Sequence, residues 1–347
     1  MTIRDAMRRL NETSCRILFV TDDHARIIGV VTDGNIRRAI ANGTGFTDVL
    51  ASIMTTTFVS IDAERGNVRQ RAVALMRKHD VAQVPVLDAG SRLVDVVTWR
   101  ECLPPGDGSA PPPQPRHTHA VVVMAGGKGT RLDPFTRILP KPLIPIREKP
   151  IIEHITDRFV ASGFHRFILV VNYKREMLKL YFNELAPSYD VHFVEEQEFL
   201  GTAGGLTLLV DHVRDNKPFI LTNCDTLLEG DYADILRWHE DQGNAMTIVA
   251  SHKIVQLPYG VLRLRDGAFH EMQEKPEIDM LVNTGTYIID PKVLTMLKSG
   301  QHCDMDELIT TVHRSGSGRV GVYPHWGEWL DIGQWEAYRE SVARISA

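Results

Sequence analysis

The sequence predicts an α/β protein in two parts, a small repeated unit followed by a larger mixed, mainly parallel sheet with helices on both faces. Residues 103–118 hold six prolines and two glycines, a composition that packs neither as helix nor as strand. Before this segment a strand–turn–strand–helix order occurs twice, and after it apolar strands alternate with helical patterns. We therefore expect domain boundaries at 1–103, 104–118 and 119–347.

The larger part contains four short apolar runs separated by stretches of helical periodicity. Strands joined through helices pair mainly in parallel, and ligands then bind beyond their carboxyl ends. Residues 126–131, Glu196 and Asp225 each follow a predicted strand, so we expect them at one rim of the sheet. The predicted strands are 120–124, 167–171, 191–194 and 219–222, and the predicted helices are 151–161, 175–185 and 232–242.

The first 103 residues contain the repeat, and Thr32 and Thr98 close the second strand of its two copies. Two copies predict a module with an internal pseudo-two-fold axis. Because the chain starts at the first helix, we expect the first copy to lack a leading strand. The helices and strands of the copies are predicted at 3–11, 15–22 and 27–40, and at 68–79, 82–88 and 93–101.

Composition excludes several classes of protein. The chain of 347 residues is 43% hydrophobic, which suffices for a full core, and its net charge of −5 gives no basic footprint for nucleic acid. Its apolar runs are too short to span a membrane, and its charged N-terminus does not fit a signal peptide. We expect a cytoplasmic protein that binds neither nucleic acid nor membrane. The widely spaced cysteines, predicted to be reduced, are Cys15, Cys102, Cys224 and Cys303.

The strongest chemical signal is a glycine-rich loop after the strand predicted at 120–124. Gly126, Gly127 and Gly129 leave the backbone N–H groups bare, so these groups can approach an oxyanion closely. Arg131 and Lys141 add two cations a short way along the chain. Bare amides with two fixed cations suit a triphosphate whose α-phosphorus is attacked. For the glycines alone, a plain turn is the alternative.

Two common phosphate-binding motifs do not fit this loop. A Walker loop needs Ser or Thr after its Gly-Lys pair, whereas Lys128 is followed by Gly129. A dinucleotide fingerprint needs a third glycine where Leu132 stands. The loop is therefore neither a P-loop nor a Rossmann turn.

Residues 126–143 closely resemble the signature of the sugar-1-phosphate nucleotidyltransferases, Gly-Gly-x-Gly-Thr-Arg-Leu-x-Pro-x-Thr followed by Pro-Lys-Pro-Leu. The likeness runs from about His119 to Tyr338, with five further pieces in the expected order. It implies a Rossmann-like, GT-A-like fold and an enzyme that converts an NTP and a sugar 1-phosphate into an NDP-sugar and pyrophosphate. Arg131 would stabilise the leaving pyrophosphate, and Lys141 the pentacoordinate phosphorus. The implied nucleotide-binding residues of the loop are Ala125, Gly126, Gly127, Gly129 and Thr130.

Asp225 and Asp331 are candidate metal ligands. A carboxylate after the strand predicted at 219–222 can hold Mg²⁺, which prefers oxygen ligands and keeps several waters. An Asx turn or a helix cap is the alternative for Asp225 alone. The family resemblance implies that the two positions hold the metal jointly, with Asp225 counted among the catalytic residues. A glycosyltransferase of similar fold more often shows Asp-x-Asp where this chain has Asn223-Cys224-Asp225, which favours nucleotidyl transfer.

Residues 196–205 are expected to hold the base, with Gly201 and Thr202 beside the ring. Family members that use uracil or thymine often carry Gln at the position of Glu196. An ionised carboxylate only accepts hydrogen bonds, so it suits the neighbouring N1–H and N2–H₂ of guanine and opposes the acceptors of uracil and thymine. We therefore predict GTP. UTP or dTTP stays open, because Glu196 lies among other glutamates and could be a surface residue.

Three later pieces match the family's sugar-phosphate site. Glu274 can take two sugar hydroxyls, and Lys275 can pair with the phosphate as a mobile point charge. Gly260 and Gly285 let the sugar ring pass close to the backbone. An exposed hairpin in which Glu274 and Lys275 form an ion pair is the alternative. The predicted sugar-phosphate residues are Tyr259, Gly260, Glu274, Lys275, Asn283 and Gly285.

The N-terminal repeat resembles a tandem pair of CBS domains, which often bind an adenine nucleotide between their copies. Thr32, Asn35 and Thr98 are then candidate ligand residues. Asn35 and Glu101 stand where such pairs have Asp, and prolines cut the second helix short. Adenine-nucleotide sensing and a module that dimerises or braces the enzyme both remain open. CBS-like pairs commonly associate face to face, so a homo-oligomer is a further expectation.

A CBS pair joined to such a transferase resembles guanylyltransferases of bacterial surface-sugar pathways, legionaminic acid biosynthesis among them. Glucosamine 1-phosphate is then the expected sugar, with mannose and heptose 1-phosphates as alternatives. The rival interpretations are a uridylyl- or thymidylyltransferase, a nucleotide sensor, and a catalytically inactive regulatory homologue. The joint presence of Arg131, Lys141, Asp225 and Asp331 argues against inactivity.

Overall fold

The computed structural model describes residues 1–12, 17–64, 66–79, 81, 83–98, 116–213 and 215–344. The chain divides into two compact units, Met1–Pro112 and Pro113–Ala347. Among the described helices, none combines the length and the apolar character needed to cross a bilayer. Outside the described residues lie most of the predicted linker 104–118, Cys15, Glu101 and Cys102.

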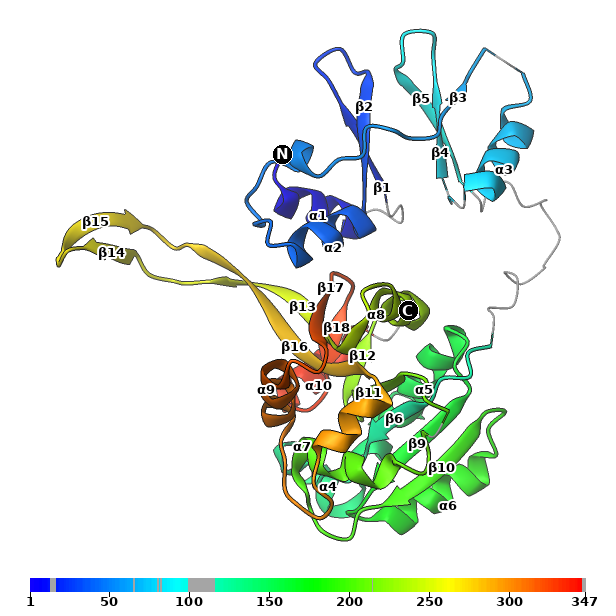
Figure 1. Cartoon of the computed structure of the whole chain (residues 1–347), viewed down its shortest axis with the longest axis vertical. Coiled ribbons are helices and arrows are strands. Elements are labelled where there is room, and N and C mark those ends of the chain that lie inside the picture. The colour runs from blue at the N-terminus through cyan, green and yellow to red at the C-terminus, as the bar shows by residue number, and fades with distance from the viewer. Residues whose placement is uncertain are drawn as a thin grey trace. The chain divides into compact units, whose positions relative to one another are not determined.

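The N-terminal unit contains both copies of the repeat (Figure 1). In the first copy β1 pairs antiparallel with β2, and in the second β4 lies between β3 and β5. Within the described residues the sheet of the first copy has two strands and that of the second has three. The elements are α1 (Ile3–Glu12), β1 (Ile17–Thr21), β2 (Ile27–Thr32), α2 (Asp33–Ala41), η1 (Leu50–Ser52), β3 (Ile61–Asp62), α3 (Val68–His79), β4 (Gln83–Leu87) and β5 (Leu93–Thr98).

The C-terminal unit is built on a seven-stranded sheet in the order β10-β9-β6-β11-β16-β13-β17. Neighbouring strands are parallel except on both sides of β16, so the predicted mixed, mainly parallel sheet is confirmed. The four predicted strands are all present within a residue or two of their expected ends. The strands are β6 (Val121–Met124), β9 (Arg166–Val171), β10 (Asp190–Glu195), β11 (Phe219–Asn223), β13 (Asn244–Gln256), β16 (Glu277–Ile289) and β17 (Arg319–His325).

Helices cover both faces of this sheet, because alternate residues of its strands point to opposite sides. Val121 and Val123 pack into one core with α5, α6 and α8, whereas Val122 packs into a second core with α7, η5 and α9. Burial on both faces explains why the central strands are continuous apolar runs. The covering elements are α5 (Ile151–Ala161), α6 (Arg175–Leu185), α7 (Gly201–Gly204), η5 (Gly205–Leu209), α8 (Tyr232–Asp241), η6 (Pro291–Met296) and α9 (Met305–Ser315).

Short elements lie around the carboxyl ends of the strands. The most consequential is a small antiparallel pair, β12 with β18, which places Thr226 opposite Asp331. This pairing returns the C-terminal segment to the end of β11, which lies just before β12 in the chain. These elements are η3 (Thr130–Leu132), α4 (Phe135–Ile138), η4 (Lys141–Leu143), β7 (Pro145–Ile146), β8 (Lys149–Pro150), β12 (Thr226–Leu228), β18 (Trp329–Asp331) and α10 (Trp335–Arg344).

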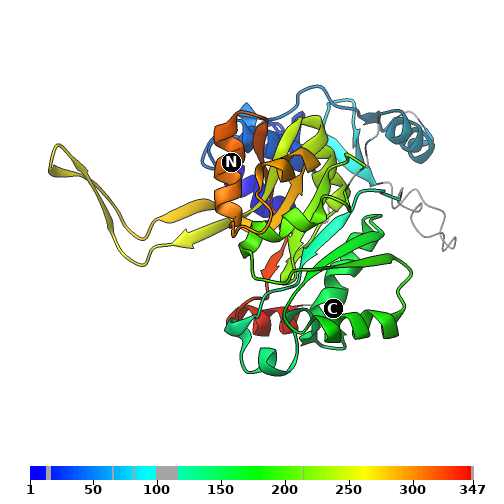
Figure 2. The ribbon, with the colours of Figure 1, turned by 60° about the horizontal axis from the view of Figure 1, so that its bottom comes forward.

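A long two-stranded projection extends from the sheet. β13 and β16 pair from Met246 opposite Ile289 out to Gln256 opposite Glu277. Residues 257–276, which we call the arm, continue outward and end in the hairpin of β14 (Val261–Arg265) and β15 (Ala268–Gln273). Both views show this hairpin standing away from the body of the C-terminal unit (Figures 1 and 2).

Candidate active site

The predicted rim is present at the carboxyl edge of the sheet. β10, β9, β6 and β11 are parallel neighbours, so their carboxyl ends lie along one edge. The glycine loop leaves β6, Glu196 follows β10, and Asp225 follows β11. The chain therefore gathers these three segments although they are far apart in sequence.

Lys141, Asp225 and Asp331 converge on Gly333. The Ile332 N–H donates to the Asp225 carbonyl oxygen (2.9 Å), which fixes the end of β18 beside the end of β11. Lys141 Nζ donates to Asp225 Oδ2, and both side chains are buried. A Cβ added at Gly333 would lie 2.5 Å from Asp225 Oδ2 and 2.9 Å from Asp331 Oδ1. The same point is 3.2 Å from Lys141 Nζ, so two carboxylates and an ammonium surround a space that glycine leaves open.

The ion pair keeps a positive charge in this buried place. Burial acts to lower the pKa of Lys141, but neighbouring groups, with the Asp225 charge and its hydrogen bond among them, together act more strongly in the opposite direction. The pKa is therefore raised, and the lysine is charged at neutral pH. Arg131 is exposed and close enough for its charge to act against that of Lys141. Burial raises the pKa of the Cys224 thiol to about 12, so this thiol remains neutral. Cys224 and Cys303 are both free thiols, as predicted for the two cysteines that are described.

The glycine loop is bounded by Lys141 at one end and by Glu196 at the other. Gly129 has φ +66°, and a Cβ there would lie 3.0 Å from the Cβ of Lys141. A Cβ at Gly126 would lie 3.3 Å from Glu196 Oε2. At Gly127, no atom would come within 4 Å of an added Cβ, so the middle of the loop is open. Glycine is therefore required at Gly126 and Gly129, where the loop contacts Glu196 and Lys141. The backbone around Gly127, between these two positions, is accessible.

The remaining predicted residues of this segment have different surroundings. Ala125 is buried, and its N–H donates to the Val170 carbonyl (2.8 Å), so this amide belongs to the sheet and is not free to bind a phosphate. Thr130 and Arg131 are exposed in the turn η3, directly after the open part of the loop. Among these residues Arg131 carries the charge, and its contact with a triphosphate stays a prediction.

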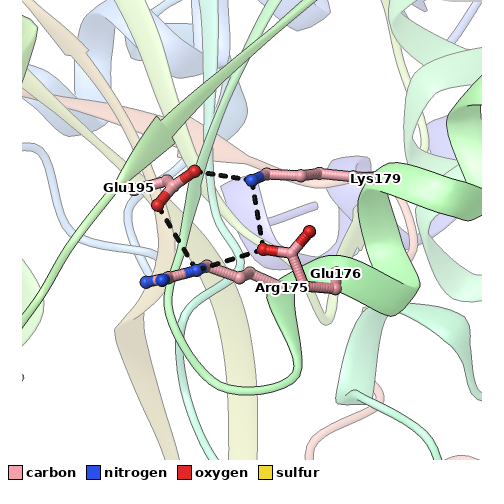
Figure 3. Close-up of polar contacts among 4 residues, drawn as sticks. All are labelled: Arg175, Glu176, Lys179 and Glu195. Carbon is pink, nitrogen blue, oxygen red and sulfur yellow. Dashed lines mark hydrogen bonds and ion pairs between the residues drawn. The ribbon is translucent and has the colours of Figure 1, made fainter.

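Glu195, the residue before Glu196, is held on the other side of its strand by α6 (Figure 3). Lys179 Nζ lies 2.5 Å from Glu195 Oε1, and Arg175 Nε lies 3.3 Å from Glu195 Oε2. Glu176 closes the ring, at 3.2 Å from Lys179 and 3.4 Å from Arg175. The hydrogen bond from Lys179 lowers the pKa of Glu195. Of the two adjacent glutamates, Glu196 is thus the one that faces the glycine loop.

Glu196 is buried between two glycines. Its Oε1 accepts a hydrogen bond from the Leu200 N–H (3.0 Å). A Cβ at Gly205 would lie 3.1 Å from Glu196 Oε1, and one at Gly126 would lie 3.3 Å from Oε2. Burial raises the pKa of Glu196. The surface position considered as an alternative for this carboxyl is therefore not found, whereas its contact with a base stays a prediction.

Gly201 and Thr202 lie where α7 meets the start of α9. Gly201 has φ +83°, and a Cβ there would come within 2.5 Å of the Cys303 carbonyl oxygen. The Thr202 N–H donates to Asp304 Oδ1 (3.0 Å), and Thr202 Oγ1 accepts from the Met305 N–H (2.8 Å). These contacts explain both residues by packing and capping. Their contact with the base stays a prediction.

The six predicted sugar-phosphate residues form two separate groups within the chain. Asn283 and Gly285 lie near the rim: Gly285 has φ +78°, and a Cβ there would be 2.4 Å from Asn223 Nδ2. Between the two groups, the segment Glu277–Asn283 alone spans about 20 Å of extended strand. The ladder of β13 and β16 carries the outer group outward from the rim, and the assembly of all six residues into one sugar-phosphate site stays a prediction. The outer group, all exposed on the arm, is Tyr259, Gly260, Glu274 and Lys275.

The candidate CBS ligands have structural partners. Thr32 caps α2: its Oγ1 accepts from the Asn35 N–H (3.2 Å), and Asn35 Oδ1 accepts from the Thr32 N–H (2.9 Å). Asn35 Nδ2 also donates to Thr55 Oγ1 (3.0 Å). Thr98 ends β5 at the corresponding place in the second copy. An adenine nucleotide at these residues stays a prediction.

Asp225 and Asp331 fit a divalent cation in their chemistry and their convergence. Mg²⁺ is commonly bound through one or two carboxylates and completes its shell with water and phosphate oxygens. Over the described part of the chain, no group of three or more His, Cys, Asp and Glu side chains could hold a metal on its own. A cation between Asp225 and Asp331 would therefore complete its shell with water or substrate oxygens.

Sequence reasoning missed three residues of the site. Gly333 leaves the space between the two carboxylates, and Asn223 lies against Gly285. Lys128 Nζ lies 5.3 Å from the centre of the Phe199 ring, which links the glycine loop to the segment after Glu196. A glycine two residues after a candidate metal ligand was the signal that could have pointed to Gly333. The contact between Lys128 and Phe199 had no signal, because it depends on the parallel order of the strands.

Solved structures show the fold of the C-terminal unit. HddC from Yersinia pseudotuberculosis, solved alone and in complex with GMP-PN, matches with TM-scores of 0.52 and 0.53 at 24% sequence identity. The matches cover 66% of this chain and all of the matched chains. This likeness establishes the fold class.

The family follows from the sequence. Residues 120–347 match the model of the nucleotidyl transferase family, and residues 1–42 and 50–104 match the CBS domain. The chain therefore belongs to the nucleotidyl transferase family and carries CBS domains at its N-terminus. Both resemblances noted in the sequence are confirmed.

Curated relatives differ in the nucleotide that their names specify. Mannose-1-phosphate guanylyltransferase catalytic subunit beta of Danio rerio is 31% identical over 220 residues, and the match covers 61% of each chain. The probable glucose-1-phosphate cytidylyltransferase of Bacillus subtilis is 31% identical over 233 residues, covering 61% of this chain and 90% of the relative. A UTP–glucose-1-phosphate uridylyltransferase of Synechocystis is 30% identical over 246 residues, covering 64% and 63%. The chain thus spans about three fifths of the length of the first relative.

Proposed function

We propose that this protein transfers a nucleotidyl group from an NTP to a sugar 1-phosphate and releases pyrophosphate. The observation that carries the proposal is the convergence of Lys141, Asp225 and Asp331 on the space beside Gly333, next to an open glycine loop. A cation, two carboxylates and accessible amides at one strand edge suit a reaction in which charge on phosphate oxygens must be neutralised.

The reaction needs no general base, because the attacking sugar phosphate is already anionic at neutral pH. Its oxygen forms a bond to the α-phosphorus of the NTP while the bond from that phosphorus to the bridging oxygen breaks, and the electron pair leaves with pyrophosphate. Lys141, fixed by Asp225, supports the pentacoordinate phosphorus, and the exposed Arg131 binds the departing pyrophosphate. Catalysis is then positioning and charge stabilisation.

The cofactor in this proposal is Mg²⁺, held by Asp225 and Asp331. When bound there, the ion neutralises charge on the α-phosphate. Lys141 already donates to Asp225 Oδ2, so the same carboxylate orients both the lysine and the cation. A substitution of Asp225 is therefore expected to affect two functions of the site.

The base in this proposal is guanine. The names of the relatives include guanylyl-, cytidylyl- and uridylyltransferases, so they support the class and not the base. Support for guanine comes from Glu196, which is buried beside Gly126 and Gly205 with an acceptor oxygen toward the glycine loop. Glucosamine 1-phosphate for surface-sugar biosynthesis is our first choice of sugar, and mannose and heptose 1-phosphates follow.

A substrate panel tests this proposal. Pyrophosphate release is measured for GTP, UTP, CTP and dTTP, each with glucosamine, mannose and heptose 1-phosphates, in the presence and absence of Mg²⁺. We expect GTP to give the highest kcat/KM and Mg²⁺ to be required. Preference for UTP or dTTP would refute the role of Glu196, and no turnover with any pair would refute the enzymatic proposal. Arg131→Ala serves as the control for contaminating activity.

A further inference from the structure

The arm is an amphipathic ribbon with one uncovered apolar face. β14 and β15 pair Leu262 with Met272 and Leu264 with Phe269, so these four side chains share a face. They are 58%, 56%, 68% and 67% exposed, respectively. A lone two-stranded hairpin is marginally stable in water. This face therefore needs a cover that the described part of the C-terminal unit does not provide.

The base of the arm holds a preformed polar cluster. The Lys275 N–H donates to the Tyr259 carbonyl oxygen (3.2 Å), which joins the two strands at this level. A Cβ at Gly260 would lie 2.9 Å from Glu274 Oε2, so this carboxylate lies directly over the glycine. Four residues chosen from the sequence as sugar-phosphate ligands thus lie side by side. They are separated from Asn283, from Gly285 and from the cleft where the nucleotide is proposed to bind.

The strands that carry the arm lead this cluster away from the cleft of the same chain. The ladder from Met246–Ile289 to Gln256–Glu277 is continuous apart from one bulge at its inner end, between Val249 and Ala250. Beyond that bulge the register is regular, so a return of the arm to its own rim would break a run of backbone hydrogen bonds, each of which costs free energy when lost. The arm is thus directed outward by the same strands that form the sheet.

A second copy of the chain offers the cleft that the cluster lacks and an apolar surface beside it. Phe135 and Ile138, on α4 between the glycine loop and Lys141, are 40% and 73% exposed. The centres of the Phe135 and Trp335 rings lie 5.1 Å apart, so Phe135 on α4 packs against Trp335. The apolar face of the arm and the two exposed apolar side chains of α4 are complementary surfaces of one chain. In a two-fold exchange, each copy would bury both of these surfaces against its partner.

We propose that the arm of one copy completes the sugar-phosphate site of a second copy, with Glu274 and Lys275 reaching the cleft that contains Lys141 and Asp225. The inference rests on the proposed function, because it assigns the sugar phosphate to these residues. The exchange is reciprocal, so each active site contains the rim of one protomer and the arm of its partner. A monomer would lack four of the six predicted sugar-phosphate residues.

Complementation between two inactive variants tests the exchange. Arg131→Ala disables the cleft and leaves the arm intact, whereas Glu274→Ala/Lys275→Ala disables the arm and leaves the cleft intact. All three residues are exposed, so both variants are expected to fold. Each is purified alone and after co-expression with the other, and pyrophosphate release is compared with wild type. If the two variants pair at random into closed dimers that exchange arms, about a quarter of all sites combine the intact cleft of one variant with the intact arm of the other.

Recovery to about a quarter of wild-type activity in the co-expressed sample would support the exchange. A co-expressed sample no more active than either variant alone, beside an active wild type, would overturn it. Sedimentation of the wild type and of Leu264→Asp/Phe269→Asp supplies a readout that does not depend on activity. We expect a dimer that dissociates in this variant. If the wild type turns over no substrate, the proposed function fails. Sedimentation then decides by itself whether the arms associate. A monomeric wild type would overturn the exchange.

Discussion

Replacement of Gly333 by alanine is the sharpest test of the candidate site, because the change adds one methyl group where three charged side chains meet. The added Cβ would lie 2.5 Å from Asp225 Oδ2, whereas ordinary contact begins near 3.4 Å, so this oxygen must move by about 0.9 Å. Asp331 Oδ1, at 2.9 Å, must move by about half as much. Misplacement of reacting groups by about 1 Å costs roughly 10²-fold in rate. We therefore expect kcat for pyrophosphate release to fall about 100-fold.

The same variant should need more Mg²⁺ for half-maximal rate, since both proposed ligands are displaced. Overpacking of a buried site costs about 1–3 kcal/mol, so the variant should remain folded, and thermal melting checks this. Gly66→Ala is the matched control, because an added Cβ there meets no atom within 4 Å. If Gly333→Ala keeps its kcat within two-fold of wild type, Lys141, Asp225 and Asp331 do not act together beside Gly333, and the proposed active site is wrong.

Lys141→Met should lower kcat about 10²–10³-fold, and it should destabilise the protein by about 3–5 kcal/mol because it leaves the buried Asp225 without its cation. Urea unfolding checks this, and the double variant with Asp225→Asn should regain stability but no activity. Glu196→Gln should lower kcat/KM for GTP about 10–100-fold through the loss of a hydrogen bond to a charged acceptor, and an unchanged ratio of GTP to UTP turnover would argue against the base contact. Because burial raises the pKa of Glu196, the folded state binds this proton more tightly than the unfolded chain does. Its contribution to stability is complete below the usual value of 4.5 and is lost as the pH rises through the raised folded pKa, so Glu196→Gln should gain melting temperature relative to wild type at pH 7 but not below pH 4.5. Calorimetric titration of the full chain with AMP separates the two interpretations of the CBS pair: heat that Thr32→Ala abolishes indicates sensing, and the absence of heat in wild type favours a bracing module.

The strands, the covering helices and the rim could be predicted because each is determined by a short, continuous stretch of the sequence. An apolar run with β-branched residues, such as Val121 to Met124, becomes a buried strand whichever neighbour it pairs with. Parallel order then places the residues after each strand at one edge. The glycine loop, Glu196 and Asp225 followed from this rule alone.

The ion pair of Lys141 with Asp225 and the path of the arm could not be predicted, because both depend on partners distant in sequence. Lys141 and Asp225 were assigned to separate roles, on the phosphorus and on the metal, and no local pattern indicates that they are bonded. Likewise, alternating apolar residues in 257–276 predict a hairpin equally well whether it lies over its own cleft or projects from it. The ion pairs that hold Glu195 also needed the structure, since the basic residues that form them lie on α6.

The direction of the arm depends on the orientation of β13 and β16 in the sheet, because the same two strands belong to the sheet at one end and carry the arm at the other. Sheets twist by an amount that depends on how their buried side chains pack, and a change of about 5° over a 30 Å length shifts the far end by roughly 2–3 Å. Met246 and Ile289, fully buried at the root, are placed to set this angle. Substitutions at such interior positions would tune the reach of the arm, so the choice of sugar could change through residues that no substrate ever touches.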